Sequence, residues 1–566
     1  MSKTADLWWK TAVFYCADVQ TFVDSNGDGQ GDISGMARRI DYLADLGITC
    51  LWLMPLYPTR DVDDGYDITD FLAVDPRLGD LGDFVDLVRT ATSRGIRVII
   101  DFVMNHTSDH HPWFLEARKS TDNPYRDYYV WRSTAPPDTS ALVSFPDKED
   151  SIWQKDDRTG EWYLHHFYKE QPDLNTANPD VRAELVKVMG LWLELGVSGF
   201  RIDAVPFLFS RDIVPKKDET FQWDPHETLR HLKAFCGHRS AEVILLGEVN
   251  VARAEQEAFF GGVNGDELTM QFDFIGMQAT WLSFARGSAA PLVEALRDRP
   301  EVDEGNQWAT FLRNHDELTL DKLTATERQE VFDAFGPEPG MQLYGRGLRR
   351  RLPPMFDGDP RRIRLAYALL FSLPGSPVLF YGEEIGMGEN LRLPGRLAVR
   401  TPMQWSSAPN GGFSSAPKRR LVRALPEGGY GPAHINVSQQ RNDPDSMWTF
   451  MAQLIRRYRQ TPEFGWGRFE PIAQPVDSVL AHVARLESWA TVAVHNLSDE
   501  ACHVHLSLST LAEGGLPPIS HLADLLGDHQ VEPADDGKGS QSIDVDLEGY
   551  GYRWLRVVRE GDERIA

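Results

Sequence analysis

Strand-length apolar runs alternate with amphipathic helical segments through the first hundred residues of the chain. The apolar runs occupy residues 13–19, 49–54 and 97–102. The segments with helical spacing occupy residues 35–46 and 80–94. Each helical segment stops at a glycine, Gly47 or Gly95, as helix ends commonly do. This alternation predicts a parallel sheet with right-handed crossovers.

The pattern resumes after a long interruption. Residues 104–175 are polar, aromatic and proline-rich with little periodicity, which is too long for a simple loop. Further strands are expected at residues 199–203, 243–247, 268–272, 309–314 and 378–381. Further helices are expected at residues 179–195, 361–372 and 446–459. Eight strand–helix units predict a (β/α)8 barrel, whose active site lies at the carboxyl ends of its strands.

The same pattern divides the chain. Short alternating strands after residue 466 predict an all-β C-terminal domain, which we expect to be a sandwich. The fold class is therefore α/β, a TIM barrel with a small domain inserted after strand three and a C-terminal all-β domain. The expected boundaries are 1–103 and 176–465 for the barrel, 104–175 for the inserted domain and 466–566 for the last domain. Two insertions are expected within the barrel, near 319–351 and 382–440.

The composition of the chain restricts the classes of molecule that it is expected to bind. The 566 residues include 58 Lys and Arg against 84 Asp and Glu, a net charge of −26. Such acidity disfavours nucleic acid, whose phosphates need clustered cations, and suits a neutral substrate such as a sugar. No apolar run reaches the roughly 18 residues of a membrane span. The sequence leaves open whether copies of the chain form a homo-oligomer.

Cysteine usage and the amino-terminal residues bear on location. The four cysteines are far apart and form no CxxC pair: Cys16, Cys50, Cys236 and Cys502. The first ten residues contain no apolar signal core. Both observations predict reduced thiols and a cytoplasmic protein.

Acidic residues follow several of the expected strands. Asp101, Asp203, Glu248 and Asp316 each end or closely follow an apolar run. A buried acid is costly unless it is paired, hydrogen-bonded or used in chemistry. Taken alone, each of these carboxylates is also explained as a helix cap or a salt-bridge partner. In parallel strands, however, all four would meet at one rim.

These strand ends carry a resemblance to a known family. The four stretches are Asp101-Phe-Val-Met-Asn105-His106, Gly199-Phe-Arg-Ile-Asp203, Gly247-Glu248-Val249 and Asn314-His315-Asp316. In order and spacing they resemble the four short regions of the α-amylase superfamily, glycoside hydrolase family 13. The resemblance runs from about residue 8 to the C-terminus. It implies an enzyme that acts on α-glucosides.

The resemblance assigns the catalytic roles. Retaining cleavage needs two carboxyl groups roughly 5–5.5 Å apart. Asp203 matches the nucleophile and Glu248 the acid/base, while Asp316 matches the carboxylate that holds the sugar 2- and 3-hydroxyls. Arg201 lies on the same strand face as Asp203 and would keep it ionised. Apolar neighbours of Glu248 would raise its pKa and keep its proton near neutral pH.

The resemblance also implies a closed glucose pocket. His106 and His315 would donate hydrogen bonds to the glucose. Tyr66 would stack on its ring, and Asp63 would bind its 4- and 6-hydroxyls. A wall at this place favours removal or transfer of a terminal glucose over cutting within a chain. A polar turn is the alternative explanation of the segment around Asp63.

A loop after the first strand predicts a calcium site. Oxygen-bearing side chains stand at alternate positions, as calcium loops require: Asp24, Asn26, Asp28, Gln30 and Asp32. The loop is not an EF-hand, because Gly35 stands at its twelfth position. It resembles the calcium loop of family members that act on oligosaccharides, and a metal-free cluster of turns is the alternative. Asn105 and Asp173 are candidates for a second calcium site.

Finer features are similar to one group within the family, the trehalose synthases, which interconvert maltose and trehalose. Besides Asn250, the similar stretches are residues 24–32, 106–114, 203–206, 311–319, 384–388 and 400–405. Two features depart from that group. Trehalose synthases tend to carry an arginine that helps seal the pocket, and Leu142 stands at that position. They usually show Asp-Arg-Asn at a second position, where this chain has Gly395-Arg396-Leu397. Arg396 and Arg400 are candidates for glucose contact.

Three functions remain open from the sequence. The favoured one is intramolecular transfer of glucose, which needs water to be excluded while the covalent intermediate waits. The second is a hydrolytic exo-α-glucosidase, or a transferase to another small acceptor. The third is a non-catalytic sugar-binding barrel. The expected partner is a small α-glucoside such as maltose or trehalose.

Overall fold

Eight parallel strands close into a barrel at the centre of the molecule, as the sequence predicted. The computed structural model describes residues 7–209, 224–511, 516–535 and 541–561. In spatial order the barrel is β1-β14-β10-β9-β8-β7-β3-β2, and every neighbouring pair is parallel. The bounds are β1 Phe14–Ala17, β2 Cys50–Leu53, β3 Arg97–Phe102, β7 Gly199–Ile202, β8 Ile244–Gly247, β9 Met270–Phe272, β10 Gln307–Thr310 and β14 Ser376–Phe380.

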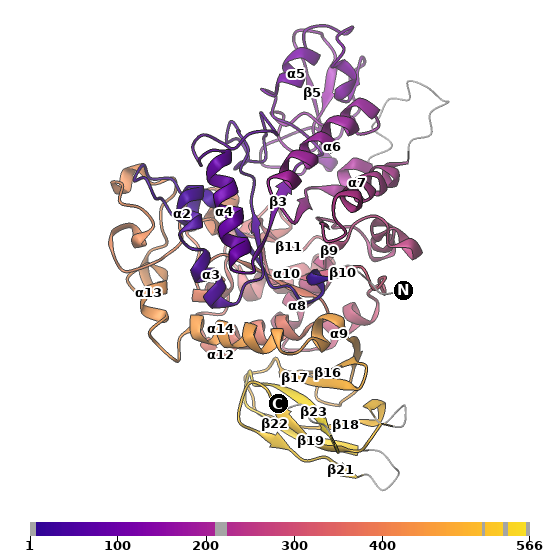
Figure 1. Ribbon diagram of the computed structural model, residues 1–566, viewed down its shortest axis with the longest axis vertical. Helices are drawn as coiled ribbons and strands as arrows, with labels where there is room; N and C mark the ends of the chain where they lie inside the picture. Colours follow the sequence, from indigo (N-terminus) through magenta and orange to yellow (C-terminus); the bar gives the residue numbers. More distant parts are fainter. Residues whose placement is uncertain (1–6, 210–223, 512–515, 536–540, 562–566) are drawn as a thin grey trace.

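Helices surround this barrel (Figure 1). The long ones are α4 Leu81–Ser93, α6 Pro179–Glu194, α7 Pro225–Arg239, α8 Phe274–Arg286, α10 Ala325–Phe335, α12 Pro360–Ser372 and α14 Met447–Arg459. The shorter ones are α1 Val19–Phe22, α2 Ile33–Ala37, α3 Ile40–Leu46, α5 Pro112–Ala117, α9 Ala290–Arg297, α11 Leu352–Met355, α13 Val437–Gln440 and α15 Glu463–Trp466. Side-chain caps fix several starts, since Asp80 caps α4 and Ser446 caps α14.

Two expected elements differ in the structure. The single helix expected at residues 35–46 is broken into α2 and α3, because Arg39 leaves the helical conformation and lays its guanidinium over the Trp405 ring at 4.1 Å. The strand expected at 309–314 ends at Thr310. Beyond it Phe311 packs edge-on against Phe272 at 5.3 Å, so the following residues form the rim of the barrel instead of its wall.

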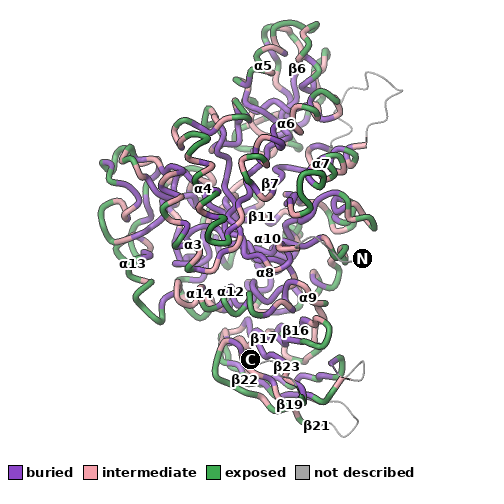
Figure 2. The backbone as a smooth tube through the Cα atoms, viewed as in Figure 1, coloured by how far each residue is buried: buried purple, intermediate pink, exposed green. Residues whose placement is uncertain are grey.

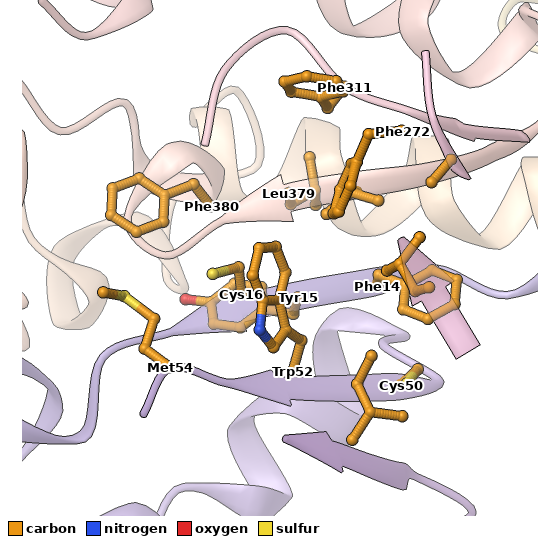
Figure 3. Close-up of a cluster of buried hydrophobic side chains, with 14 of the residues drawn as sticks. Phe14, Tyr15, Cys16, Cys50, Trp52, Met54, Phe272, Phe311, Leu379 and Phe380 are labelled. Carbon is orange, nitrogen blue, oxygen red and sulfur yellow. The ribbon is translucent and has the colours of Figure 1, made fainter. Parts of the chain in front are cut away.

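Large apolar side chains fill the barrel interior. Figure 3 shows Trp52 of β2 facing Phe272 of β9 across this core, and their ring centroids are 5.5 Å apart. The Trp52 indole also donates a hydrogen bond of 2.8 Å to Asp101. The packed core therefore continues directly into the polar rim. Close strand contact demands glycine at Gly199, where a Cβ would lie 2.4 Å from the Ile244 carbonyl oxygen.

The segment after β3 forms a small sheet of its own at one end of the molecule (Figure 1). It consists of β4 Trp131–Arg132, β6 Trp162–Leu164 and β5 Trp153–Lys155, in that spatial order. A separate apolar cluster, built on Val130, Ile152, Trp153 and Leu164, supports it. A second small sheet follows β10, in the order β11 Leu318–Thr319, β13 Gly347–Leu348 and β12 Gln342–Leu343.

The C-terminal residues form two antiparallel sheets at the other end (Figure 1). One contains β15 Arg468–Pro471, β16 Val479–Leu486, β17 Trp489–Asn496, β23 Tyr552–Arg559, β19 Ile519–Asp524 and β20 Gln530–Val531. The other contains β18 Cys502–Ser507, β22 Gln541–Leu547 and β21 Ala534–Asp535. Figure 2 shows the buried chain concentrated in the barrel and between these sheets. Among the described residues, no helix combines the length and apolarity that a membrane crossing requires.

Candidate active site

One guanidinium collects three carboxylates at the carboxyl end of the barrel. Arg201, on β7, places Nη1 2.6 Å from an Asp203 oxygen and 2.5 Å from an Asp101 oxygen. Its Nη2 lies 2.8 Å from Glu248 Oε2. The parallel strands β3, β7 and β8 end together and bring these groups to one point. Arg201 and Asp101 are fully buried, so their charges are held largely out of water.

Backbone strain helps to join the two predicted reacting groups. Ala204, directly after Asp203, adopts a left-handed conformation with φ of 50°. Its amide donates a hydrogen bond of 3.0 Å to Glu248 Oε2. A left-handed residue with a Cβ costs roughly 1–2 kcal/mol, so the surrounding packing must hold it.

A second set of arginines surrounds Asp316. Arg396 Nη1 lies 2.8 Å and Arg400 Nη2 2.9 Å from the same carboxylate oxygen. Arg400 also bonds Asp64 at 2.6 Å, and Arg396 bonds Glu317 at 2.8 Å. Asp316 is thus fixed from two sides, facing the carboxylates on Arg201.

The carboxylates around Arg201 and the carboxylate between Arg396 and Arg400 differ in their proton affinities. Burial raises the pKa of Asp203 to about 6 and that of Glu248 to about 7, and Arg201 opposes both rises. Burial would also raise the pKa of Asp316, but the charges of Arg396 and Arg400 bring it well below its ordinary value. Asp316 is therefore permanently ionised, whereas the other two titrate near neutral pH.

The predicted glucose-binding residues line one wall. The Tyr66 and His315 rings are stacked, with centroids 5.7 Å apart, and the Tyr66 hydroxyl lies 2.7 Å from His315 Nε2. Gln171, from the inserted segment, donates to Asp63 at 3.1 Å and lies 3.2 Å from His106 Nε2. Burial lowers the pKa of His106 to about 4 and that of His315 further, so both rings are neutral.

These groups surround a cavity of about 350 Å³, within the range of pockets that bind small molecules. The predicted residues that line it are Asp63, Tyr66, His106, Asp203, Glu248, Asn250, Asp316 and Arg396. Three predicted residues lie behind this lining and contact residues within it: Arg201, His315 and Arg400. Asn250 donates to Asp321 at 2.9 Å, at the outer part of the cavity.

Several lining residues were not predicted from the sequence. Besides Val143 and Ser144, these include Phe167, Phe207, Phe274, Glu317, Asp321 and Arg346. Glu317 directly follows Asp316, and this adjacency was the available signal. Arg346 lies in an insertion without any motif, so nothing in the sequence pointed to it.

The predicted calcium loop is tightly wound. Asp24 accepts backbone hydrogen bonds from Asn26 and Gly27 on one oxygen and from Gly29 on the other. Asp28 accepts from the Gln30 amide, and Asp32 accepts from Ser25 and caps α2. Local backbone hydrogen bonds therefore orient Asp24, Asp28 and Asp32 within the loop. No three His, Cys, Asp or Glu side chains form a metal-binding cluster in the described ranges, so any ion here depends on amide oxygens too.

The structure also brings Asn105 and Asp173 together. The Asn105 amide donates to Asp173 at 3.2 Å, and His166 bonds the same carboxylate. Nitrogen donors therefore already occupy this carboxylate, and a second calcium site stays a prediction.

The pKa values predict a bell-shaped pH profile for kcat/KM. Asp203 must be ionised to attack, so activity should fall as pH drops through about 6. Glu248 must be protonated to assist departure, so activity should fall as pH rises through about 7. The acid and alkaline limbs of the profile report the coupled titration of Asp203 and Glu248, because both carboxylates contact Arg201.

An α-glucosyl fluoride provides the control for this profile. Fluoride leaves without a proton, so the rate of fluoride release should lose its alkaline limb and keep its acid limb. A profile for a disaccharide that stays flat from about pH 5 to about pH 9 would contradict these assignments.

Comparisons with known proteins agree with this geometry. A family described as "Alpha amylase, catalytic domain" matches residues 19–332 and 350–467, and "Sucrose hydrolase-like, C-terminal domain" matches 490–556. The trehalose synthase/amylase of Mycobacterium tuberculosis is 41% identical over 557 residues, 97% of this chain and 90% of that protein. The trehalose synthase of Pimelobacter sp. is 39% identical over 97% of this chain and 96% of that protein.

A solved structure shows the same architecture. The isomaltulose synthase of Protaminobacter rubrum matches with a TM-score of 0.75 at 26% identity, over 98% of this chain and 100% of that one. Family, fold and the arrangement of strand-end carboxylates thus agree over nearly the whole length. The chain belongs to the α-amylase family, glycoside hydrolase family 13, and is an enzyme of that family.

Proposed function

We propose that this enzyme interconverts maltose and trehalose by moving one glucose within a closed pocket. The observation that carries the proposal is the pairing of Asp203 and Glu248 on Arg201, facing a cavity of about 350 Å³ with the fixed carboxylate Asp316 opposite. The trehalose synthases that are about 40% identical over almost the whole chain support this choice of substrate.

In the first step the glycosidic bond is exchanged for an ester. A carboxylate oxygen of Asp203 attacks the anomeric carbon, and the bond from that carbon to the bridging oxygen breaks. Glu248 gives its proton to the bridging oxygen, and free glucose forms. A pKa of about 7 lets Glu248 hold this proton near neutral pH, while Asp203, at about 6, is already ionised.

The fixed charges position the sugar during this step. Asp316 is always ionised and would accept hydrogen bonds from the 2- and 3-hydroxyls. Asp63 would bind the far side of the ring, and neutral His106 would donate to it. Hydrogen bonds that strengthen as the ring distorts lower the barrier of the reaction.

The second step decides the product. The released glucose turns so that its anomeric hydroxyl faces the ester, Glu248 takes the hydroxyl proton, and the oxygen attacks the anomeric carbon. This reaction regenerates Asp203 and yields a 1,1-linked disaccharide. Water performs the same attack if it enters, so the cavity must stay closed while glucose turns.

Hydrolysis is the second candidate, and one observation favours it. Leu142, on the rim, is 55% exposed and stands where trehalose synthases are expected to carry a sealing arginine. An exposed leucine cannot form that polar contact. We do not propose the non-catalytic barrel, because all three carboxylates are present and converge.

Product analysis tests the proposal. With maltose the enzyme should give trehalose, and with trehalose it should give maltose, each with only minor free glucose. Asp203→Asn should keep the wild-type melting temperature and lose at least about 10⁴-fold in kcat, because it removes the nucleophile. If both disaccharides yield glucose alone, the enzyme is a hydrolytic α-glucosidase and the isomerase proposal fails.

We also propose that the loop of residues 24–32 binds calcium. Its donors would be Asp24, Asn26, Asp28 and Asp32 with an oxygen of Gln30, all hard oxygen ligands of the kind calcium prefers. The wound loop supports the proposal, because backbone amides already orient its carboxylates. An ion here would stabilise the loop after β1 and take no part in the reaction.

Chelation should therefore lower the melting temperature by a few degrees, since an ion that binds only the folded state stabilises it. Asp28→Asn should melt nearly alike with and without chelator, because Asp28 is exposed and replacing it weakens the site without disturbing the core. An unchanged wild-type melting temperature after exhaustive chelation would remove the calcium proposal.

Location and assembly remain predictions. All four cysteines lie in the described residues and are unpaired thiols, three of them buried. Unpaired thiols support the proposed cytoplasmic location. Whether the chain forms a homo-oligomer is a separate question that a sedimentation measurement answers.

A further inference from the structure

A hairpin from the insertion after β10 reaches the mouth of the cavity. Strands β12 and β13 pair Leu343 with Gly347, and residues 344–346 form the turn between them. Tyr344 and Gly345 both take left-handed conformations, with φ of 56° and 64°. Tyr344 adopts this conformation despite its Cβ, which costs roughly 1–2 kcal/mol. The tight turn directs the side chains of Tyr344 and Arg346 toward the inserted segment.

Arg346 bridges two parts of the chain that are 202 residues apart. Its Nη2 donates a hydrogen bond of 2.8 Å to the Ser144 carbonyl oxygen. The same nitrogen lies 3.2 Å from Glu317 Oε1, and the guanidinium stacks 5.1 Å from the Tyr344 ring. Ser144, Glu317 and Arg346 all line the cavity. The bridge therefore crosses the rim of the pocket.

Aromatic packing reinforces this bridge. The rings of Phe145 and Tyr344 lie 5.2 Å apart, so the residue after Ser144 also contacts the hairpin. The Arg396 guanidinium lies 4.8 Å from the Phe145 ring and bonds Glu317. A continuous set of contacts thus runs from Ser144 through Arg346, Glu317 and Arg396 to Asp316. These contacts link the rim of the cavity to the residues around Asp316.

We propose that Arg346 is the latch that closes this pocket, in place of an arginine at Leu142. Leu142 lies two residues before Ser144 on the inserted segment, whereas Arg346 approaches the same stretch from the opposite wall. The positive charge at the rim would thus come from the β12–β13 hairpin and not from the inserted segment. This inference rests on the proposed function and names the residue that sets its ratio of transfer to hydrolysis.

The latch acts on the second step only. Arg346 contacts neither Asp203 nor Glu248 among the interactions described above, so formation of the glucosyl ester does not depend on it. Holding Ser144 against the hairpin keeps the released glucose inside and water outside while the glucose turns. Arg346 is a positioning residue, and its loss should change the fate of the intermediate and leave its formation intact.

The test is Arg346→Ala with maltose and added ¹³C-labelled glucose. We expect the ratio of hydrolysis to transfer to rise on the order of tenfold, because a hydrogen bond from a charged donor is lost. Labelled glucose should enter the disaccharide product of the variant and hardly enter that of wild type. Fluoride release from α-glucosyl fluoride, which reports formation of the ester, should stay within about twofold of wild type in its kcat/KM.

Two further variants separate the latch from a general loss of structure. Arg392→Ala removes an exposed arginine that pairs with exposed Glu427 outside the cavity, and it should behave as wild type. Leu142→Arg in the Arg346→Ala background returns a guanidinium from the inserted segment and should restore most of the transfer. Melting temperatures of all variants identify any that fail to fold.

The outcomes are distinct. An unchanged product ratio in a folded Arg346→Ala enzyme would overturn the latch and leave the proposed function standing. An equal loss of fluoride release, transfer and hydrolysis would also overturn it, because that pattern indicates damage to the catalytic carboxylates. If wild type itself only hydrolyses maltose, the proposed function fails, and the sealed rim fails with it.

Discussion

The site depends on one buried arginine that holds three buried carboxylates. Asp101, Asp203 and Glu248 would repel one another and lose hydration if they were placed together without a cation. Arg201 offsets this cost with contacts of 2.5, 2.6 and 2.8 Å from two nitrogens. The barrel allows it, because parallel strands in closed order end at one rim and deliver each acid to the same guanidinium. Removing Arg201 would leave unpaired charge in the core.

The number of cations near each carboxylate then assigns its chemical task. Asp203 and Glu248 share one arginine, so burial prevails and their pKa values rise to about 6 and about 7. Asp316 is paired with two arginines, Arg396 and Arg400, and its pKa falls well below the ordinary range. The first two can exchange protons or attack near neutral pH, whereas the third can only hold hydroxyls. The division follows from the surroundings and not from the acids themselves.

The sequence was sufficient to locate acidic residues that directly follow a strand. The barrel, and the convergence of Asp203, Glu248 and Asp316, could be read from apolar runs that lead into acids. The sequence was insufficient where a side chain reaches across the fold. Arg39 breaks a helix by stacking on Trp405, nearly 370 residues away in the chain, and no local pattern carries that contact. Arg346 sits in an insertion without a motif, and its bond to Ser144 exists only once two insertions meet.

The most direct test of this account is to identify the residue that carries the glucosyl group. The enzyme would be incubated with 5-fluoro-α-glucosyl fluoride, which forms the ester quickly and loses it slowly, then quenched, digested and examined by mass spectrometry. A sugar adduct is expected on the peptide that contains Asp203 and none in the Asp203→Asn variant. An adduct on the peptide of Glu248 or Asp316, or rapid fluoride release with no adduct at all, would contradict it.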